Sequence, residues 1–342
     1  MNDVGMSASA TSESIASLLQ LSTNFIVSRG VQVAVELGIP DRMGDGETSL
    51  VDLAQGTSCD PATLARLLRM LAGWGIVTDT SSGYRLTALG QFLRSEVPGS
   101  LQSWFRLSFR SYTMFDGLLE SVRTGKPAFE QVYGASYFDY FAANPAEGAV
   151  FDKAMEDFGR MASGAVIDAY DFTKSGRIVD VGGGTGHYLT QILSANPASR
   201  GILFDQPHVA AAAEASLKGG NFEDRIQVAG GDFFTSVPAG GDLYLLAWII
   251  HDWDDEDAVR ILRNCRTAMK PGNRLLIVES VVPEDAEPHL SKLMDLVMLV
   301  GLGGRERTRA QYSELLANAG FTLGQVIPTK SPQSLLEATL IR

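Results

Sequence analysis

The sequence has few cysteines, no long apolar run and a shortage of positive charge. Cys59 and Cys265 are the only cysteines and lie far apart, so neither a disulfide framework nor a cysteine zinc site can be built, and a reducing cytoplasm is the predicted compartment. No apolar run reaches the roughly 18 residues of a transmembrane helix. The 28 basic residues are outnumbered by 40 acidic ones, which disfavours binding to nucleic acid or to an anionic membrane.

Histidine is also scarce, and its spacing disfavours a metal centre. The four histidines follow no metal-ligand pattern: His187, His208, His251 and His289. We therefore predict that the protein holds no metal. The rest of the composition is ordinary, because 342 residues of which 45% are hydrophobic can build a sizeable core in one large domain or two moderate ones.

A glycine-rich loop is the most informative motif. The apolar strand that carries Asp180 opens into Gly182-Gly183-Gly184-Thr185-Gly186. Glycine tolerates positive φ and lets backbone N–H groups approach a ligand closely. The spacing is D-x-G-x-G-x-G; a dinucleotide pattern would need its third glycine at His187. We predict a nucleotide-like ligand at this loop, and the alternative is an ordinary tight turn between strand and helix.

Helical spacing dominates the N-terminal part of the chain. Apolar residues recur at helical intervals from about residue 12 to 38, with breaks predicted at Gly30 and Gly38. Two short helices are predicted at 48–55 and 62–73, and Asp60 and Pro61 suit the start of the second. A small hairpin follows at 75–78 and 84–87. Helices followed by a hairpin are typical of a winged helix.

Winged helices often bind DNA, but the charge of this one argues against that function. The segment from Asp41 to Glu96 holds five arginines, no lysine and seven acidic residues. Such a balance does not attract phosphates, so a protein-protein module is favoured.

Aromatic clusters mark residues 101–172. They lie at 104–115 and 137–141 and are separated by proline- and glycine-containing breaks. This pattern indicates helices that form the wall of an enclosed interior. Most of these aromatic residues belong to a core. The stretch 151–161 is the best candidate for ligand contact, because methionine next to phenylalanine suits an adaptable flat pocket.

Strands and helices alternate beyond residue 175. Short apolar strands are predicted at 178–181, 201–204, 226–228, 243–247 and 275–280. This pattern predicts a parallel doubly wound sheet. Ligands of such sheets bind at the carboxyl ends of the strands.

Polar residues stand at several predicted strand ends. Asp205 lies 19 residues beyond Gly186 and suits a carboxylate that accepts from ribose hydroxyls, although a helix N-cap is the alternative. Asp232 can accept from an adenine amino group, with Phe233 against the ring. His251 lies just past the fourth strand, in the expected ligand crevice, and is the favoured catalytic residue over a structural histidine.

Two glutamates follow later in the chain. Glu279 comes after four apolar residues of the fifth strand, and an exposed strand-end acid is its alternative. Glu306 lies between two predicted helices, where a loop ion pair with an arginine is equally plausible. The acidic run 254–257 has a structural explanation as the negative first turn of a helix.

Together these motifs resemble the S-adenosylmethionine-dependent O-methyltransferases. The motifs are Asp180–Gly186, Phe204–Pro207, Gly231–Phe233, His251–Trp253, Glu279-Ser280 and Gly303–Thr308. The resemblance covers about residues 15–342, and six motifs in order are far more specific than the glycine loop alone. More narrowly, the chain is similar to plant caffeic acid O-methyltransferases and to bacterial enzymes that methylate antibiotic and pigment precursors.

The resemblance implies an α/β protein with three parts. They are a mainly helical, winged-helix-like dimerisation domain (1–100), a helical connector that contributes to the substrate pocket (101–172) and a Rossmann-like doubly wound methyltransferase domain (173–342). It also implies a homodimer formed through the N-terminal domain, and a small hydroxylated secondary metabolite as substrate.

The resemblance further implies roles for individual residues. His251 is the implied base, with Glu279 and Glu306 around it, and which glutamate orients the imidazole stays open. The implied contacts to S-adenosylmethionine come from Gly182, Gly184, Asp205, Gln206, Gly231, Asp232, Phe233, Ala247 and Trp248. Plant members often have a lysine where Ala247 stands, so that contact is missing or supplied otherwise. The predicted substrate pocket is lined by Met155, Phe158, Met161, Trp253 and Met298.

The implied reaction is methylation of an aromatic hydroxyl. A phenol with a pKa of about 10 is mostly protonated at neutral pH, and a neutral imidazole can take its proton as the new bond forms. Three rival functions are a non-methylating enzyme on the same scaffold, a DNA-binding regulator and a metal-dependent catechol methyltransferase. The presence of His251 argues against the non-methylating enzyme, and the acidic charge argues against the DNA-binding regulator. The lack of metal-ligand spacing argues against the metal-dependent methyltransferase.

Overall fold

The structure is a computed structural model that describes residues 8–341. It divides into two compact units. The first runs to Tyr112 and includes Ala149–Asp157, and the second comprises Thr113–Gly148 and the chain from Phe158 onward. The domain boundaries inferred from the sequence stay a prediction.

The first unit begins with one long helix, α1 (Ala8–Glu36). The predicted break at Gly30 is wrong, because α1 continues through that residue. A Cβ on Gly30 would lie 2.0 Å from Cε of Met70. Glycine therefore serves close packing of α1 against α4 (Pro61–Gly73) and does not end the helix.

The remainder of the first unit has the predicted order of helices followed by a hairpin. Side chains of Ser49, Asp60 and Thr87 cap the helices that follow them by accepting a backbone N–H. The three short strands pair in the order β1-β3-β2. The elements are α2 (Ile39–Met43), β1 (Glu47–Thr48), α3 (Leu50–Thr57), α4, β2 (Val77–Asp79), β3 (Tyr84–Leu86), α5 (Ala88–Gln91) and α6 (Gln102–Arg110).

Short helices rich in aromatic residues open the second unit. They are η1 (Ser111–Gly117), α7 (Leu118–Thr124), α8 (Phe129–Tyr133) and α9 (Tyr137–Ala143), and they are followed by the long helix α10 (Pro145–Ala169) and by η2 (Phe172–Lys174). None of the helices within residues 8–341 is long and apolar enough to cross a membrane.

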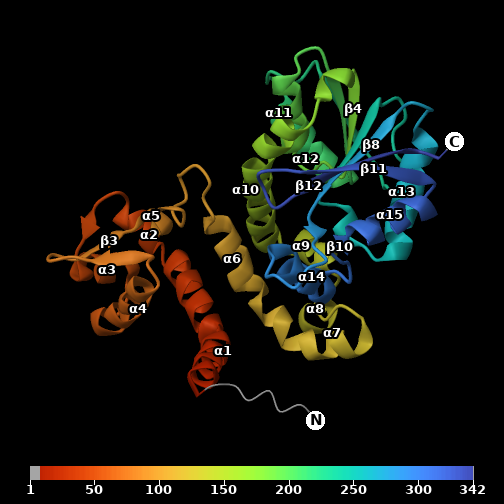
Figure 1. The fold of residues 1–342 in the computed structure, drawn as a ribbon. Coiled ribbons are helices and arrows are strands. Elements are labelled where there is room, and N and C mark those ends of the chain that lie inside the picture. Colours follow the sequence, from red (N-terminus) through yellow and green to blue (C-terminus); the bar gives the residue numbers. More distant parts are fainter. Residues whose placement is uncertain (1–7, 342) are drawn as a thin grey trace, which may run out of the picture. The chain divides into compact units, whose positions relative to one another are not determined.

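A seven-stranded sheet forms the centre of the second unit (Figure 1). Its order is β11-β12-β8-β7-β4-β5-β6. The five predicted strands are parallel: β4 (Arg177–Val181), β5 (Arg200–Asp205), β6 (Ile226–Gly230), β7 (Leu243–Ala247) and β8 (Arg274–Glu279). Sequence analysis missed β11 (Phe321–Pro328) and β12 (Ser334–Leu340), which are antiparallel and make the sheet mixed.

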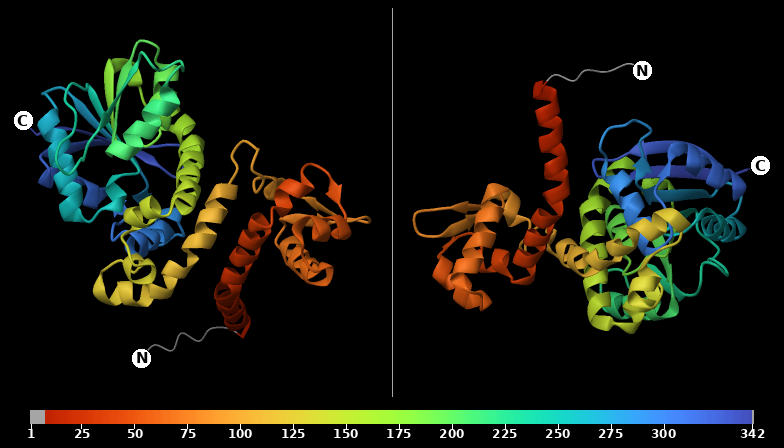
Figure 2. Two further views of the ribbon diagram at one scale, coloured as in Figure 1. Left: turned by 180° about the vertical axis from the view of Figure 1, so that it is seen from behind. Right: turned by 90° about the horizontal axis from the view of Figure 1, so that it is seen from below.

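Helices cover both faces of this sheet, as Figures 1 and 2 show. Residues of α13 (Asp255–Ala268) and α15 (Arg309–Asn318) pack on one face. Residues of α10, α11 (His187–Ala195) and α12 (Pro207–Leu217) pack on the other. The remaining elements are η3 (Ile250–Asp252), β9 (Val281–Val282), α14 (Leu290–Gly301) and β10 (Arg307–Thr308).

The topology fixes where a ligand can bind. Strand β4 lies between β5 and β7, so the chain order reverses on either side of it. In open α/β sheets the crevice at such a switch point, beyond the carboxyl ends of the strands, is the usual ligand site. The glycine loop follows β4 at this point.

Candidate active site

The glycine loop is closed on one side and open on the other. Gly182, Gly184 and Gly186 have positive φ values of 73°, 57° and 80°, which side-chain-bearing residues rarely adopt. A Cβ on Gly182 would lie 2.5 Å from Cδ1 of Ile249, whereas a Cβ on Gly184 would meet no atom within 4 Å. The loop therefore offers an accessible backbone surface at Gly184, where a ligand can approach.

Two acids lie next to this loop. Asp205 closes the loop, because its carboxylate accepts hydrogen bonds from the N–H groups of Gly184 (2.8 Å) and Gln206 (2.7 Å). Asp180 is buried, and its Oδ2 has no hydrogen-bond partner among residues 8–341. Burial, followed by the charge of Asp205, raises the pKa of Asp180 to about 7. An unpaired buried carboxylate oxygen beside an open glycine loop fits a ligand that brings a donor or a positive charge.

Asp232 has a structural role that the sequence did not indicate. Its carboxylate accepts from the N–H of Phe234 (2.8 Å) and from the hydroxyl of Thr235 (3.1 Å), which caps the turn after β6. Phe233 lies beside the glycine loop, with Cε1 3.6 Å from the position of a Cβ on Gly182. Gly231 allows the ring of Phe204 to pack, because a Cβ there would lie 2.6 Å from Cε2 of that ring. Cofactor contacts from Gly231, Asp232 and Phe233 stay predictions.

Strand β7 ends at Ala247 and is followed by a strained residue. Trp248 has a φ of 61°, a conformation that is costly for a bulky side chain. Its indole lies edge-on to the His251 ring, with centroids 5.9 Å apart, and edge-on to Phe158 at 5.6 Å. The strain thus places a flat aromatic group directly beside the candidate base.

Glu279 holds the backbone of the turn that carries His251. One oxygen of its carboxylate accepts from the N–H groups of Ile249 (3.1 Å), Ile250 (2.6 Å) and His251 (3.2 Å). The other oxygen accepts from the hydroxyl of Tyr312 at 2.6 Å. Both oxygens are therefore engaged, and Glu279 anchors the turn η3 without touching the imidazole.

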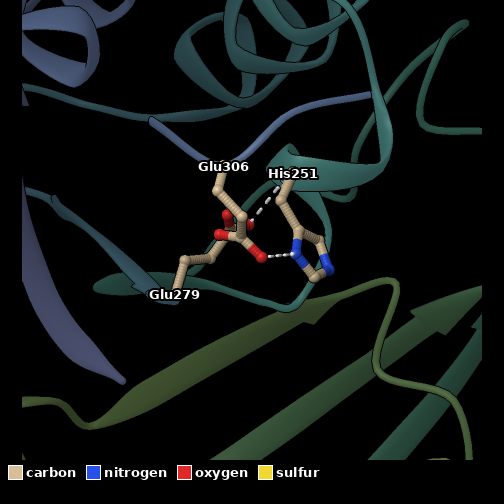
Figure 3. Close-up of side chains that lie close together, drawn as sticks. All are labelled: His251, Glu279 and Glu306. Atoms are coloured by element: carbon tan, nitrogen blue, oxygen red, sulfur yellow. Dashed lines mark hydrogen bonds and ion pairs between the residues drawn. The ribbon is translucent and has the colours of Figure 1, made fainter. Parts of the chain in front are cut away.

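Glu306 makes the contact with the imidazole. Its Oε1 lies 2.9 Å from Nδ1 of His251 (Figure 3). Its own N–H donates to Asp295 at 2.9 Å. Asp252 lies on the other side of the ring, with Oδ1 3.4 Å from Nε2 of His251. Of the two glutamates that the sequence left open, the structure pairs Glu306 with the ring and Glu279 with the backbone.

This cluster of acids sets the charge of the imidazole. Burial alone lowers the pKa of His251, but three neighbouring carboxyl groups more than offset it and raise the pKa to about 10. They belong to Asp252, Glu279 and Glu306. Burial also raises the pKa of Asp252, to about 7. The imidazole is consequently a stronger base than free histidine.

The predicted substrate residues lie on several different elements. Phe158 contacts Trp248, and Trp253 stacks on Phe138 with ring centroids 6.2 Å apart. Met298 is buried in α14, and Met161 is 48% exposed. Met155 belongs to the first unit. All five substrate contacts stay predictions.

The same cluster has the composition of a metal site, but both oxygens of Glu279 already have partners, whereas Oε2 of Glu306 is buried with none among the described residues. One ligand atom from each of His251, Glu279 and Glu306 lies within 4.8 Å of the others. A metal ion there would have to displace N–H and hydroxyl donors from Glu279. The geometry therefore suits hydrogen bonding around an imidazole better than metal ligation.

Sequence reasoning gave no role to two residues of this site. Tyr312, which completes the hydrogen bonds of Glu279, lies on α15, and no local pattern links it to that glutamate. Asp252 was part of a motif, but its proximity to Nε2 depends on the short helical turn η3. Both contacts arise from the tertiary structure.

Fold and site together are typical of an enzyme whose ligand binds at the switch point of the sheet, where the glycine loop lies, and a histidine paired with a carboxylate lies nearby. Family comparisons agree along the chain. An O-methyltransferase dimerisation domain matches residues 19–96, and an O-methyltransferase domain matches residues 115–322. The chain belongs to the S-adenosylmethionine-dependent O-methyltransferase family, which confirms the resemblance found in the sequence.

Individual relatives support this assignment. A phenazine O-methyltransferase of Lysobacter antibioticus is 43% identical over 94% of this chain and 95% of its own length. The crystal structure of human N-acetylserotonin methyltransferase in complex with SAM superposes with a TM-score of 0.88, at 28% identity, and each chain is covered completely. The aclacinomycin 10-hydroxylase of Streptomyces purpurascens is 34% identical over 92% of this chain and 86% of its own length, so relatives include a different chemistry.

Proposed function

We propose that the protein transfers the methyl group of S-adenosylmethionine to a hydroxyl of a small aromatic metabolite, and that His251 takes the hydroxyl proton. The 2.9 Å contact between Nδ1 of His251 and Glu306 carries this proposal. In the neutral ring this contact holds the proton on Nδ1, so that Nε2, which lies 3.4 Å from Asp252, is the nitrogen left to take the hydroxyl proton.

Different residues of this chain bind the cofactor and transfer the proton. The bound cofactor supplies an electrophilic methyl group on a positively charged sulfur. Gly184, Asp180 and Asp205 are the residues that would hold it, by the open loop and the two acids described above. His251 accepts the proton at Nε2, and Glu306 stabilises the resulting imidazolium. A histidine pKa of about 10 is close to the roughly 10 of a phenol, so proton transfer to the deprotonated ring is not strongly uphill, and the ring acts as base in the fraction of enzyme in which it is deprotonated.

An aromatic acceptor is supported by two observations. The relative from Lysobacter is named a phenazine O-methyltransferase, and phenazine is a flat aromatic system. In this chain the turn around His251 is flanked by aromatic side chains, with Trp248 and Phe158 in contact and Trp253 on Phe138. Such groups stack on flat rings at little entropic cost.

Product analysis tests this function directly. The enzyme is incubated with S-adenosylmethionine that carries a trideuterated methyl group and with a panel of acceptors: phenols, polycyclic hydroxyaromatics, amines and carboxylates. The masses of the products are determined by mass spectrometry. We expect one labelled methyl group on oxygen of a hydroxyaromatic acceptor. A product that gains oxygen and no methyl group, or methylation confined to amines or carboxylates, would refute the proposal.

The charge of Asp252 should set the pH dependence of the rate. Its carboxylate is among the groups that raise the pKa of His251, so Asp252→Asn lowers that pKa and the imidazole loses its proton at lower pH. We expect the acid limb of the kcat profile to move to lower pH by about one unit or more. The profile is measured with saturating cofactor. A limb that stays in place or moves to higher pH contradicts the role of His251 as base.

Activity should also survive the removal of metal ions. Because Glu279 is fully engaged by protein donors, the imidazole and not a metal ion handles the hydroxyl proton. We expect the full rate in the presence of excess chelator. Loss of activity that added magnesium restores would show that a metal takes part.

We place the enzyme in a reducing cytoplasm. Cys59 and Cys265 are free thiols, one half-buried and the other buried. Unpaired cysteines are usual in that compartment.

We further propose a homodimer formed through α1. Six large apolar side chains on this helix are each more than half exposed, which a stable surface helix avoids without a partner: Ile15, Leu18, Leu19, Leu21, Phe25 and Ile26. We expect light scattering to show a dimer, and a Leu18→Glu/Phe25→Glu variant to be monomeric. Val51→Glu alters another exposed apolar residue, on α3, and should stay dimeric. A wild-type protein that is monomeric and fully active at micromolar concentration would contradict this.

A further inference from the structure

Arg307 is a fully buried cation directly behind the candidate base. Its side chain is 0% exposed, and it is one of the largest fully buried side chains among the described residues. A buried guanidinium is retained only where all of its charge and its donors are compensated. Its contacts therefore show what it holds in place.

The guanidinium binds one acid and three backbone carbonyls, one of which is that of Arg305, 3.4 Å from Nη1. Nε and Nη2 donate to Oδ1 of Asp255 at 3.0 and 2.9 Å. Nη1 donates to the carbonyl of Ile250 at 2.9 Å, and Nη2 to that of Trp253 at 2.8 Å. These two carbonyls lie immediately before His251 and after Asp252. Arg307 thus binds the backbone at both ends of η3, the turn that carries His251.

The turn is held from its N–H side as well. Glu279 accepts three of its N–H groups, as described above. Gly304 packs so closely that a Cβ there would lie 2.1 Å from the carbonyl oxygen of His251. The backbone of η3 is consequently bound by a carboxylate through its donors and by a guanidinium through its acceptors, and the imidazole can occupy only a narrow range of positions.

We propose that Arg307, held in place by Asp255, is a positioning residue for His251. The planar fork of arginine reaches two separate carbonyls and a carboxylate at once, and a lysine ammonium cannot reproduce that geometry. Arg307 acts through the backbone and touches neither substrate nor cofactor. The inference rests on the proposed role of His251 as base, and it gives a function to Asp255, whose acidic run otherwise has only the structural role of beginning a helix.

The variant Arg307→Lys tests this inference in the full-length enzyme. We expect kcat on a hydroxyaromatic acceptor to fall by about 10- to 100-fold, because a small displacement of a catalytic group is costly. The KM of the acceptor and the affinity for S-adenosylhomocysteine, measured by calorimetry, should stay within about threefold of wild type, since neither binding surface is touched.

A second arginine, at the opposite end of β8 from Glu279, supplies the matched control. Arg274 donates to the hydroxyls of Tyr170 and Ser175 and pairs with Glu337. Arg274→Lys removes a comparable fork far from η3, so it should lower the melting temperature but leave kcat within about twofold of wild type. An Arg307→Lys enzyme with kcat within twofold of wild type, or one whose loss Arg274→Lys reproduces, overturns the inference.

Two further variants keep the test decisive. If Arg307→Lys does not fold, Asp255→Asn loosens the guanidinium and must lower kcat without changing cofactor affinity; an unchanged kcat overturns the inference. His251→Ala separates this inference from the proposed function. A wild-type rate in His251→Ala overturns both, whereas a slow His251→Ala beside a fast Arg307→Lys overturns only the role of Arg307.

Discussion

Replacing His251 by alanine should lower the rate of methyl transfer by roughly 100- to 10,000-fold, which corresponds to about 2.7 to 5.5 kcal/mol of activation free energy. In the proposed mechanism the imidazole takes the proton at Nε2, and alanine offers no group that can do so. Single-turnover rates with a phenol of ordinary pKa measure the effect. Calorimetry with S-adenosylhomocysteine should give wild-type affinity, because the cofactor is held at the glycine loop and not by the imidazole.

A surface histidine serves as the control for this substitution. His289 is exposed at the start of α14, so His289→Ala should retain the rate within about twofold. A folded His251→Ala enzyme that keeps the wild-type rate would remove His251 from the reaction.

Replacing Gly184 by valine should remove detectable cofactor binding. The substituted Cβ would project into the open space at the loop, where the cofactor is expected, and a branched side chain tolerates the φ of 57° poorly. Calorimetry with S-adenosylhomocysteine on the folded variant measures the loss. Unchanged affinity would show that the cofactor does not approach this face of the loop.

A second glycine variant distinguishes the effect of backbone strain from the loss of the cofactor site. Gly219 also has a positive φ, of 74°, and a Cβ there meets no atom within 4 Å. Gly219→Val therefore introduces similar strain away from the loop. It should lower stability by about 1 to 3 kcal/mol and still bind the cofactor, whereas Gly184→Val should not bind at all.

The parts of the fold that sequence predicts well are those with a local signal. Strands β4 to β8 are short apolar runs between helices, and each was placed within two residues at either end. The sequence did not predict strand β11, because Gly324 and Pro328 interrupt its apolar pattern. The pairing of β11 with β12 is also irregular, since its register shifts between Leu323 and Val326. The prediction at Gly30 was wrong for the opposite reason, because a glycine inside a packed helix looks the same in sequence as one that ends a helix.

In the candidate site, too, the sequence predicts the features that have a local signal and misses those that depend on distant contacts. The glycine loop and His251 stand out in the sequence because each lies just past the end of a short apolar strand. The separate roles of Glu279 and Glu306 depend on contacts across 28 and 55 positions, and no local pattern encodes those. The turn cap made by the carboxylate of Asp232 was likewise not predicted, and the adenine contact suggested by its position after β6 stays a prediction.

The dependence of the rate on acceptor acidity tests the central claim most directly. Methyl transfer by wild type and by His251→Ala is measured over a series of phenols whose hydroxyl pKa falls from about 10 to below the assay pH. We predict that the deficit of His251→Ala is largest for the least acidic phenol and shrinks steadily, because an acceptor that is already ionised needs no base. An equal deficit for every phenol would contradict the account, since His251 would then contribute something other than removal of the proton.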